Sequence, residues 1–373
     1  MPQKILFLTT AHHYNDDRIF YHQAQELALH GDRVKIVSLS SDFVGNLNRI
    51  EIESYNILNE VSSKKIQKFI QIIEEFQPQT ILCSEPLAVV AAKKSKIEAR
   101  IIYDVTEWYP SKRMLSPYSF FFKPIHYIKF LLIQLYSGWI SNAFIFGEEA
   151  KKYPLAFVFP FKPKIILPYY PDKKYISEKI KELNPESITL CYTGIISKEK
   201  GFENFINVIK ELQKSKPDVK VKTLIIGKVQ KEEDYFFLDN YLRENPNVTI
   251  IPTVAFTDFS NSIKEADICF DLRGINQENH RCLPIKIFYY MASGKPFIYS
   301  NLNAIRNHFD TKNIGFLVEP TDYKKIVGII DDYLSTPDLY NTHAKNAVKI
   351  FNEKLSWESI KARFLEFVKP HTP

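Results

Sequence analysis

The sequence predicts an α/β protein with two Rossmann-like domains, each built on a doubly wound parallel sheet. Short apolar runs of the length of buried strands alternate with stretches of helical spacing, an alternation typical of parallel sheets. The alternation pauses at 171–187, a polar stretch with two prolines, and such a stretch is typical of an interdomain linker. The 373 residues also exceed the size at which one hydrophobic core usually gives way to two.

The first half opens with an apolar run over 4–10, which a polar loop separates from a helix ending at Gly31. A strand over 34–39 follows, and a strand, helix and strand joined this closely predict a right-handed βαβ unit. Further helices are expected near 62–76 and 86–96, and further strands at 80–83, 100–104, 144–146 and 164–167. The half lacks the G-x-G-x-x-G fingerprint, so it gives poor support for a nicotinamide or flavin cofactor.

The second half repeats the alternation. Its expected strands lie at 188–193, 222–226, 248–251, 267–272 and 297–299. Its expected helices lie near 231–244, 258–266, 321–335 and 338–352. A last helix is expected to begin at Ser356, because serine is a favoured N-cap residue.

In the stretch 278–296 a polar loop leads directly into the start of a helix. A polar loop over 278–282 leads through Pro284 into a helical run, which Gly294 ends and Pro296 cannot continue. A helix N-terminus has free N–H groups and a partial positive charge, so it attracts phosphates. The alternative is a surface loop that leads into an ordinary packed helix.

Composition narrows the class of protein. The chain is 45% hydrophobic and 25% charged, which is globular, and its net charge of +6 suits anionic ligands or an anionic membrane surface. This charge is too small to indicate nucleic acid as a partner. The four cysteines form no C-x-x-C pair, so a reducing compartment is expected. No apolar run has the length of a signal peptide or of a membrane span, and we expect a cytoplasmic protein.

Residues 108–139 are rich in aromatic side chains interspersed with basic ones. This combination suits a membrane interface, so peripheral contact with the inner face of the membrane through 108–139 is one hypothesis. The helix expected over 125–135 is interpreted as an ordinary core helix packed on the sheet. The loop 118–123 is interpreted as a contact for lipid or for an acceptor.

Residues 283–296 resemble a known segment, LPxKxFEYMAxGxP, of the family-4-like retaining glycosyltransferases of the GT-B fold, also called glycosyl transferases group 1. The resemblance implies two Rossmann-like domains that face a central cleft. It implies an acceptor-side domain over 1–170, a linker over 171–187, a nucleotide-sugar domain over 188–355 and a helix over 356–373 that crosses back to the first domain.

The second domain supplies the donor site in that family. Residues 194–201 resemble its diphosphate loop GRLxxEKG, with Ile195 in place of the arginine. The two glutamates of its E-x7-E signature fall at Arg281 and Tyr289. We hypothesise that Arg281 replaces the missing positive charge, and that Tyr289 holds the ribose or stacks on the base. The donor-binding residues that the resemblance implies are Gly194, Lys198, Lys200, Gly201, Gly227, Thr253, Val254, Glu278, Arg281, Pro284, Lys286 and Tyr289.

The first domain resembles the family at loops that follow its strands. Residues 12–18 resemble an H…DxRIF opening, 84–87 keep part of an HDPELL segment, and 103–107 resemble YDxHE with Thr106 at the histidine. The acceptor-side residues that the resemblance implies are His13, Asp17, Arg18 and Thr106. From the residues alone, Asp17 is equally an N-cap and Arg18 a solvated side chain.

A threonine cannot act as a general acid or base near neutral pH. Asp104 and Glu107 are therefore the remaining candidates for an acid or base in that loop. A retaining transferase must stabilise a departing diphosphate, which positive groups and helix dipoles can do. The expected catalytic residues are Asp104, Glu107, Lys200 and Arg281. The sequence has no D-x-D, so we expect no metal and no cofactor besides the nucleotide-sugar donor.

Three functions compete. The first is a glycosyltransferase that moves a sugar to a glycan or lipid-linked acceptor, in cell-surface polysaccharide or glycolipid synthesis. The second is a degenerate GT-B protein that binds a nucleotide or glycan without turnover, as the departures at Thr106, Ile195, Arg281 and Tyr289 would allow. The third is a sugar-nucleotide epimerase. The resemblance over 283–296 favours the first.

Overall fold

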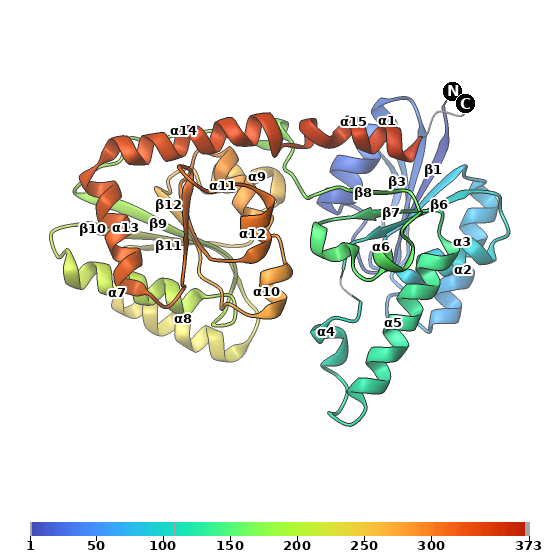
Figure 1. Cartoon of the computed structure of the whole chain (residues 1–373), viewed down its shortest axis with the longest axis horizontal. Coiled ribbons are helices and arrows are strands. Elements are labelled where there is room, and N and C mark those ends of the chain that lie inside the picture. The colour runs from blue at the N-terminus through green and yellow to red at the C-terminus, as the bar shows by residue number, and fades with distance from the viewer. Residues whose placement is uncertain (1, 108, 370–373) are drawn as a thin grey trace. The chain divides into compact units, whose positions relative to one another are not determined.

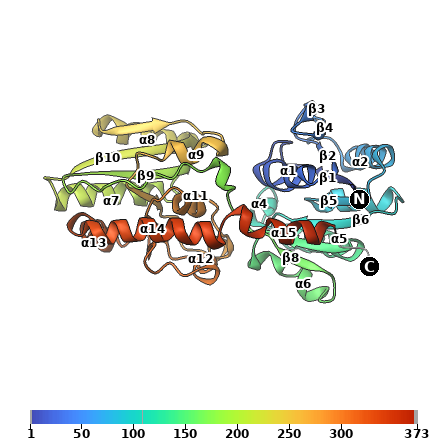
Figure 2. The ribbon, with the colours of Figure 1, turned by 90° about the horizontal axis from the view of Figure 1, so that it is seen from above.

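The computed structural model describes residues 2–107 and 109–369. The chain divides into two compact units (Figures 1 and 2). Unit 1 comprises Met1–Tyr169 with Ile360–Pro373, and unit 2 comprises Tyr170–Ser359. Each unit is an α/β body with its own sheet and its own apolar core.

The sheet of unit 1 has the strand order β3-β4-β2-β1-β5-β6-β7-β8 within the described residues. Its strands are β1 (Lys4–Thr9), β2 (Arg33–Ser38), β3 (Val44–Leu47), β4 (Ile50–Ser54), β5 (Thr80–Cys83), β6 (Arg100–Val105), β7 (Ala143–Phe146) and β8 (Lys164–Ile166). The described strand pairs are parallel except β3 with β4, which form an antiparallel hairpin at the edge. Asn48 and Arg49 turn this hairpin with positive φ.

The helices of unit 1 cover the sheet. They are η1 (Asp17–Ala24, a π-helix), α1 (Gln25–Leu29), α2 (Ser62–Phe76), α3 (Pro86–Lys94), α4 (Lys112–Leu115), α5 (Lys123–Ile140), η2 (Glu149–Lys152), α6 (Leu155–Val158) and the end of α15 (Trp357–Val368). Helix α2 shows why these segments fold on the sheet, since Phe69, Ile72, Ile73 and Phe76 recur at helical spacing and are buried in the core.

Helix α5 does not have the packing that its sequence suggested. Its buried residues are Gln134, Ser137 and Gly138, whereas Ile125 and Leu132 are 62% and 60% exposed. The interpretation of 125–135 as an ordinary core helix is therefore wrong, because its apolar periodicity lies largely outside the protein core. Trp108, the first residue of the segment 108–139, lies outside the described residues.

The sheet of unit 2 has the strand order β11-β10-β9-β12-β13-β14, and the described pairs are parallel. Its strands are β9 (Ser187–Ile196), β10 (Lys220–Val229), β11 (Val248–Ile251), β12 (Ile268–Asp271), β13 (Phe297–Ser300) and β14 (Gly315–Val318). Its helices are η3 (Lys173–Tyr175), α7 (Phe202–Ser215), α8 (Glu232–Glu244), α9 (Phe256–Ser262), α10 (Gln277–Arg281), α11 (Lys286–Ala292), α12 (Asn303–His308), α13 (Tyr323–Ser335), α14 (Pro337–Lys354) and the start of α15. Both views place α8 and α14 on opposite sides of β9 and β10 (Figures 1 and 2).

Two segments of unit 2 differ from their expected form. The polar loop expected over 278–282 is largely the short helix α10, which Asn276 caps by accepting a hydrogen bond from Asn279 N. Residues 171–187, expected as a linker, lie along unit 2: Ser177 N donates to Ser260 Oγ at 2.9 Å, and Lys181 pairs with Asp267 at 2.8 Å.

Each sheet has a topological switch point, where the chain leaves neighbouring strands toward opposite edges. In unit 1 it lies between β1 and β5, and in unit 2 between β9 and β12. The carboxyl ends of the strands at such a point leave a crevice in which open α/β sheets bind ligands. Both candidate sites lie at these points.

Candidate functional site

A buried charge cluster marks the switch point of unit 2. Asp271 ends β12 and is 1% exposed. It accepts hydrogen bonds from Arg273 Nε at 2.8 Å and Nη2 at 2.5 Å and from the Tyr299 hydroxyl at 2.9 Å, and Lys286 Nζ lies 3.1 Å from it. Burial alone would raise the pKa of Asp271, but the charges of Lys286 and Arg273 outweigh it and hold this pKa well below its usual range. One carboxylate against two cations leaves a net positive charge at the end of the sheet.

Lys286 connects this cluster to the end of β9. Its Nζ donates to the carbonyl oxygen of Thr193 at 2.5 Å. Burial lowers the pKa of Lys286, and the charge of Asp271 offsets part of that effect. At Gly194, where φ is +110°, a Cβ would lie 3.0 Å from the same Nζ. Glycine at this position therefore lets the lysine approach the backbone of β9.

Gly227 explains why β9 and β10 stay close at this end. It pairs with Gly194 across β10 and β9. Its φ is +154°, and a Cβ there would lie 1.8 Å from the carbonyl oxygen of Gly194. No side chain fits in that space. The glycine keeps both strand ends in register beside Lys286.

The loop before α7 carries the predicted Lys198 and Lys200. The loop is held by its backbone, since Lys198 N donates to Asp234 and Lys200 N donates to Ser197 Oγ, both at 3.2 Å. The two lysine side chains are 61% and 37% exposed, and their Nζ atoms lie 3.5 and 3.9 Å from glutamate oxygens. Exposed pairs of this kind are weak. Gly201 then caps α7 with φ +84°.

The remaining predicted donor residues lie on separate elements. Thr253 and Val254 lie in the loop after β11, and Thr253 is exposed. Glu278 and Arg281 are exposed on α10, and Pro284 is buried just before α11. Tyr289 on α11 is 6% exposed, with its ring edge-to-face against Phe259 at 5.2 Å between centroids. This packing leaves little of the Tyr289 ring for stacking on a base.

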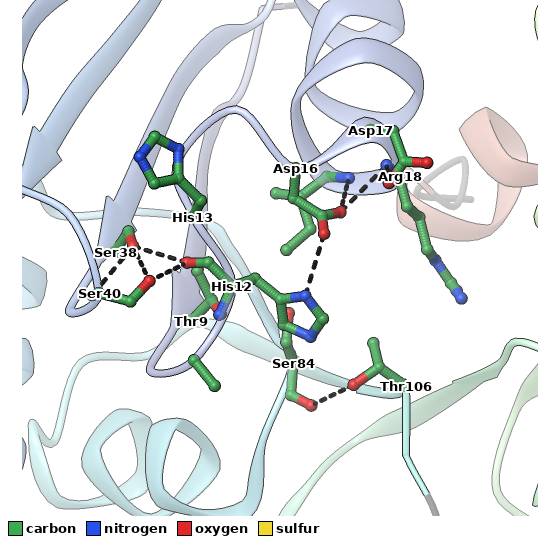
Figure 3. Close-up of polar contacts among 12 residues, drawn as sticks. Thr9, His12, His13, Asp16, Asp17, Arg18, Ser38, Ser40, Ser84 and Thr106 are labelled. Atoms are coloured by element: carbon green, nitrogen blue, oxygen red, sulfur yellow. Dashed lines mark hydrogen bonds and ion pairs between the residues drawn. The ribbon is translucent and has the colours of Figure 1, made fainter. Parts of the chain in front are cut away.

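A second polar cluster lies at the switch point of unit 1 (Figure 3). The carboxylate of Glu85, just after β5, accepts hydrogen bonds from Thr10 N at 2.9 Å, Ala11 N at 3.2 Å and Thr9 Oγ1 at 3.1 Å. Burial raises the pKa of Glu85, although these donors oppose the change. The carboxylate thus fixes the loop that leaves β1.

His12 lies within this cluster. Its Nδ1 is 3.0 Å from Asp16 Oδ2, and its Nε2 is 3.9 Å from Glu85 Oε1. Burial alone would lower the pKa of His12, but the hydrogen bond and charge of Asp16 and the charge of Glu85 raise it to about 9. His12 therefore carries a positive charge near neutral pH.

The neighbouring histidine, His13, was the one predicted. Figure 3 shows the His13 ring directed away from the His12 ring, and its Nδ1 lies 2.5 Å from Asn15 Oδ1. Sequence reasoning therefore missed His12, Asp16 and Glu85. Two adjacent histidines in one loop cannot be told apart by pattern. For Glu85 the available signal was its place two residues after the predicted strand 80–83, where ligands of such sheets bind.

Asp16, and not Asp17, caps the first helix. Asp16 Oδ1 accepts hydrogen bonds from Arg18 N at 3.0 Å and Ile19 N at 3.1 Å. The interpretation of Asp17 as the N-cap is wrong by one residue. Burial and the nearby charge of Asp16 raise the pKa of Asp17 to about 6.

Arg18 is buried rather than solvated. It is 3% exposed, and its guanidinium lies over the Tyr169 ring at 4.6 Å. Its Nη2 donates to Asp104 Oδ1 at 2.6 Å, while Gln23 Nε2 donates to Asp104 Oδ2 at 3.0 Å. Asp104 is 2% exposed. This geometry gives Asp104 a role in positioning Arg18 more readily than one in contacting a substrate.

Thr106 and Glu107 follow β6. Thr106 is 7% exposed, and its hydroxyl donates to the carbonyl oxygen of Ser84 at 3.3 Å. Its own carbonyl oxygen accepts from Lys151 Nζ at 2.5 Å. Glu107 is exposed. In the described part of the chain, no group of three or more His, Cys, Asp and Glu side chains could hold a metal ion.

Comparison with known proteins identifies the second unit. Residues 174–350 match the family Glycosyl transferases group 1. The chain carries a glycosyl transferases group 1 domain. A capsular polysaccharide biosynthesis glycosyltransferase, CapM of Staphylococcus aureus, is 25% identical over 208 residues, which are 53% of this chain and 51% of that protein. A D-inositol 3-phosphate glycosyltransferase of Paenarthrobacter aurescens (strain TC1) is 20% identical over 205 residues, 53% of this chain and 48% of that protein.

The chain thus spans about half the length of the curated relatives it matches. Among solved structures, Alr3699/HepE of Anabaena in complex with UDP and glucose has a TM-score of 0.70 and 14% identity, over 99% of this chain and 100% of that one. This likeness confirms the predicted GT-B fold.

The glycosyl transferases group 1 domain contains the whole Asp271 cluster and the predicted donor residues from Gly194 to Tyr289. The His12 cluster lies before the matched residues. The two clusters are therefore distinguished by sequence likeness as well as by unit.

Proposed function

We propose that this chain is a glycosyltransferase. It transfers a sugar with retention from a nucleotide-sugar donor to a glycan or lipid-linked acceptor, in the synthesis of a cell-surface polysaccharide or glycolipid. The observation that carries the proposal is the net positive cluster of Asp271, Arg273 and Lys286 at the switch point of unit 2, inside the matched domain. The likeness to CapM supports the polysaccharide context.

The donor diphosphate is proposed to bind against Lys286, with Lys198 and Lys200 at the rim and Arg281 contributing a further positive charge. When the bond between the anomeric carbon and the diphosphate oxygen breaks, negative charge grows on the diphosphate. Fixed cations next to that oxygen stabilise the transition state, which is the main electrostatic task of such a site. We propose that these groups serve without a metal or a further cofactor.

The donor is proposed to approach the backbone closely at three glycines, Gly194, Gly201 and Gly227. Its base is proposed to lie beside Thr253 and Val254. The other residues of the proposed donor site are Glu278, Pro284 and Tyr289. The similar structure of HepE holds UDP and glucose. UDP-sugars are therefore the first donors to test.

The acceptor side is proposed to lie in unit 1. Glu107 is an exposed carboxylate after β6, and the protonated His12 lies near the end of β1. Asp104 and Arg18 hold each other in place. His13, Asp17 and Thr106 stay candidates for contact with the acceptor.

A donor screen tests the proposal. Thermal unfolding is measured with UDP, GDP, ADP, CMP and their sugars, and any stabilising donor is then assayed for release of its nucleotide. A ligand at a hundred times its Kd adds about 2.7 kcal/mol to the stability of the native state. Lys286→Ala should weaken donor binding at least about tenfold, because it removes a charged hydrogen-bond donor.

Lys210→Ala is the matched control, since Lys210 is exposed on α7 away from the Asp271 cluster. Equal donor binding by Lys286→Ala and Lys210→Ala would contradict the proposed donor site. Unchanged turnover after treatment with EDTA is expected for transfer without a metal.

A protein that binds a nucleotide without turnover is the second candidate. The packed ring of Tyr289 and the hydrogen-bonded Thr106 favour it, since neither supplies the carboxylate or imidazole of the family pattern. Stabilisation by a donor with no nucleotide release, across a panel of glycan and lipid-linked acceptors, would support this candidate over the first.

A further inference from the structure

One side of α5 exposes a continuous apolar stripe. Its members and the turn before the helix form what we call the α5 surface: Phe120, Phe121, Phe122, Ile125, Ile128, Leu132, Tyr136 and Trp139. Phe120 and Phe121 are 81% and 83% exposed, and Trp139 is 67% exposed. The helical members recur every three or four residues, so they lie on one face along about 21 Å of helix.

The opposite side of α5 is firmly docked. Gln134, Ser137 and Gly138 are buried, and a Cβ at Gly138 would lie 2.5 Å from the side chain of Leu155 on α6. Ser137 Oγ also reaches the carbonyl oxygen of Pro86 at the start of α3. The helix therefore has a fixed rotation, and its apolar stripe cannot turn inward. Figure 1 shows the N-terminal half of α5, with α4 beside it, extending beyond the sheet of unit 1.

The exposed apolar area continues past the end of α5. Lys162 Nζ donates to the carbonyl oxygens of Gly138 and Trp139, each at 2.7 Å, and so caps the helix. The preceding residue, Phe161, is 98% exposed. Contiguous exposed apolar patches of this kind mark interaction sites, because soluble surfaces rarely tolerate them.

The segment that carries this surface has basic side chains and no acidic ones. From 108 to 147 the sequence has four Lys and Arg residues and no Asp or Glu. Lys123 and Lys129 are exposed on α5 itself, and Lys123 lines a shallow hollow with Leu115, Pro124 and Tyr127. Aromatic rings with lysines and no acids complement an anionic lipid surface, in which headgroup charge lies directly above an apolar phase.

No helix among the described residues is long and apolar enough to cross a membrane. A helix that is docked on one side by protein and apolar on the other can instead lie in the interface plane.

We propose that the α5 surface docks on an anionic lipid bilayer. The phenylalanines of the turn and Trp139 enter the boundary between headgroups and acyl chains, and Lys123 and Lys129 contact the headgroups. This inference does not depend on the proposed glycosyl transfer, because lipid binding needs neither donor nor acceptor.

Co-sedimentation of the full chain with vesicles tests it. Vesicles of phosphatidylcholine alone are compared with vesicles that also contain phosphatidylglycerol, at low and high salt. We expect binding to the anionic vesicles, weakened by salt because headgroup attraction is screened. Phe120→Ser with Phe121→Ser should reduce this binding at least about tenfold, and Lys123→Glu with Lys129→Glu should do the same.

The matched control is Tyr235→Ser with Phe236→Ser on α8, where the two rings are 61% and 66% exposed. These variants should bind vesicles as the unaltered chain does. Since all the removed aromatic side chains are exposed, circular dichroism and Tm should stay unchanged, which separates loss of binding from loss of fold.

Three outcomes would overturn the proposal. The unaltered chain could fail to bind anionic vesicles, or the α8 control could lose as much binding as the Phe120 and Phe121 variant. The third outcome combines two observations. The unaltered chain would self-associate in analytical ultracentrifugation, and Phe120→Ser with Phe121→Ser would abolish this self-association but leave vesicle binding intact. That result would assign the α5 surface to a second copy of the chain.

Discussion

At the residue scale, His12 holds a proton between two carboxylates. Its nearest partners, Asp16 and Glu85, come from a helix cap and from the end of a different strand. The histidine thereby joins the loop after β1 to the end of β5. Two carboxylates and one imidazolium in a half-buried site make the local charge balance depend on pH.

The pKa of about 9 for folded His12, against an ordinary 6.5, gives a defined pH dependence. A raised pKa means that the native state holds the proton more tightly than the unfolded chain does. The stabilisation is complete below pH 6.5 and is lost as the pH rises to about 9. His12→Gln removes it, so the variant should be less stable than the unaltered chain at low pH, on the order of 2–3 kcal/mol.

Urea unfolding of both proteins between neutral pH and pH 9.5 measures this difference. The two free energies of unfolding should converge as the pH rises past about 9. A difference that stayed constant with pH would show that His12 stabilises the loop by packing and not by its charge.

Some residues of the two polar clusters could be predicted from the sequence and others could not. The glycines at 194 and 227 and Lys286 were predicted from a segment pattern, and the structure places them together. Asp271 and Arg273 were not predicted, because a carboxylate at the end of a strand has meaning only when its partners from other strands are known. His12 was not singled out beside His13 for the same reason, since its position between Asp16 and Glu85 is known only from the structure.

At the scale of elements, the alternation of strands and helices predicted most of both sheets. The hairpin of β3 and β4 was missed, because its strands are short and alternate with polar residues at the sheet edge. The packing of α5 was misjudged for a different physical reason. Apolar periodicity shows that a face avoids water, but it does not show whether protein or lipid covers that face.

The pairing of β9 with β10 yields a prediction at this scale. Gly227→Ala forces a Cβ to within 1.8 Å of the carbonyl oxygen of Gly194, so the strand ends must separate beside Lys286. We expect destabilisation of about 1–3 kcal/mol and weaker donor binding. Calorimetric unfolding and donor titration measure both effects.

Gly328→Ala is the control for that substitution. Gly328 lies inside α13, and a Cβ there meets open space among the described atoms. Alanine favours a helix over glycine, so this variant should gain up to about 1 kcal/mol. If Gly227→Ala were equally well tolerated, the close approach of the two strands would not matter for the fold.

At the scale of the whole molecule, α15 begins in unit 2 and ends in unit 1. In unit 1 its residues Phe364 and Val368 are fully buried, and Lys369 Nζ pairs with both carboxylate oxygens of Asp32 at 2.9 Å. The core of unit 1 is therefore completed by a segment remote in the sequence.

Phe364→Ala should destabilise unit 1 by about 3–5 kcal/mol, since it leaves a cavity in a closed core. Limited proteolysis with mapped cleavage sites should show faster cutting within residues 1–169 and unchanged cutting within 170–359. Glu366→Ala on the same helix is exposed and should change stability by less than about 0.5 kcal/mol. Equal acceleration of cutting in both units would contradict the independence of their cores.

Unit 1 is built from two segments that are far apart in the sequence, and this affects the order in which the two units can fold during synthesis. Unit 2 is one contiguous segment, so its core needs no residue from outside 170–359. The first 169 residues emerge earlier but must wait, with the place of Phe364 open, until α15 has been translated. The part of the chain that is made first thus completes its core only after the last helix has been made.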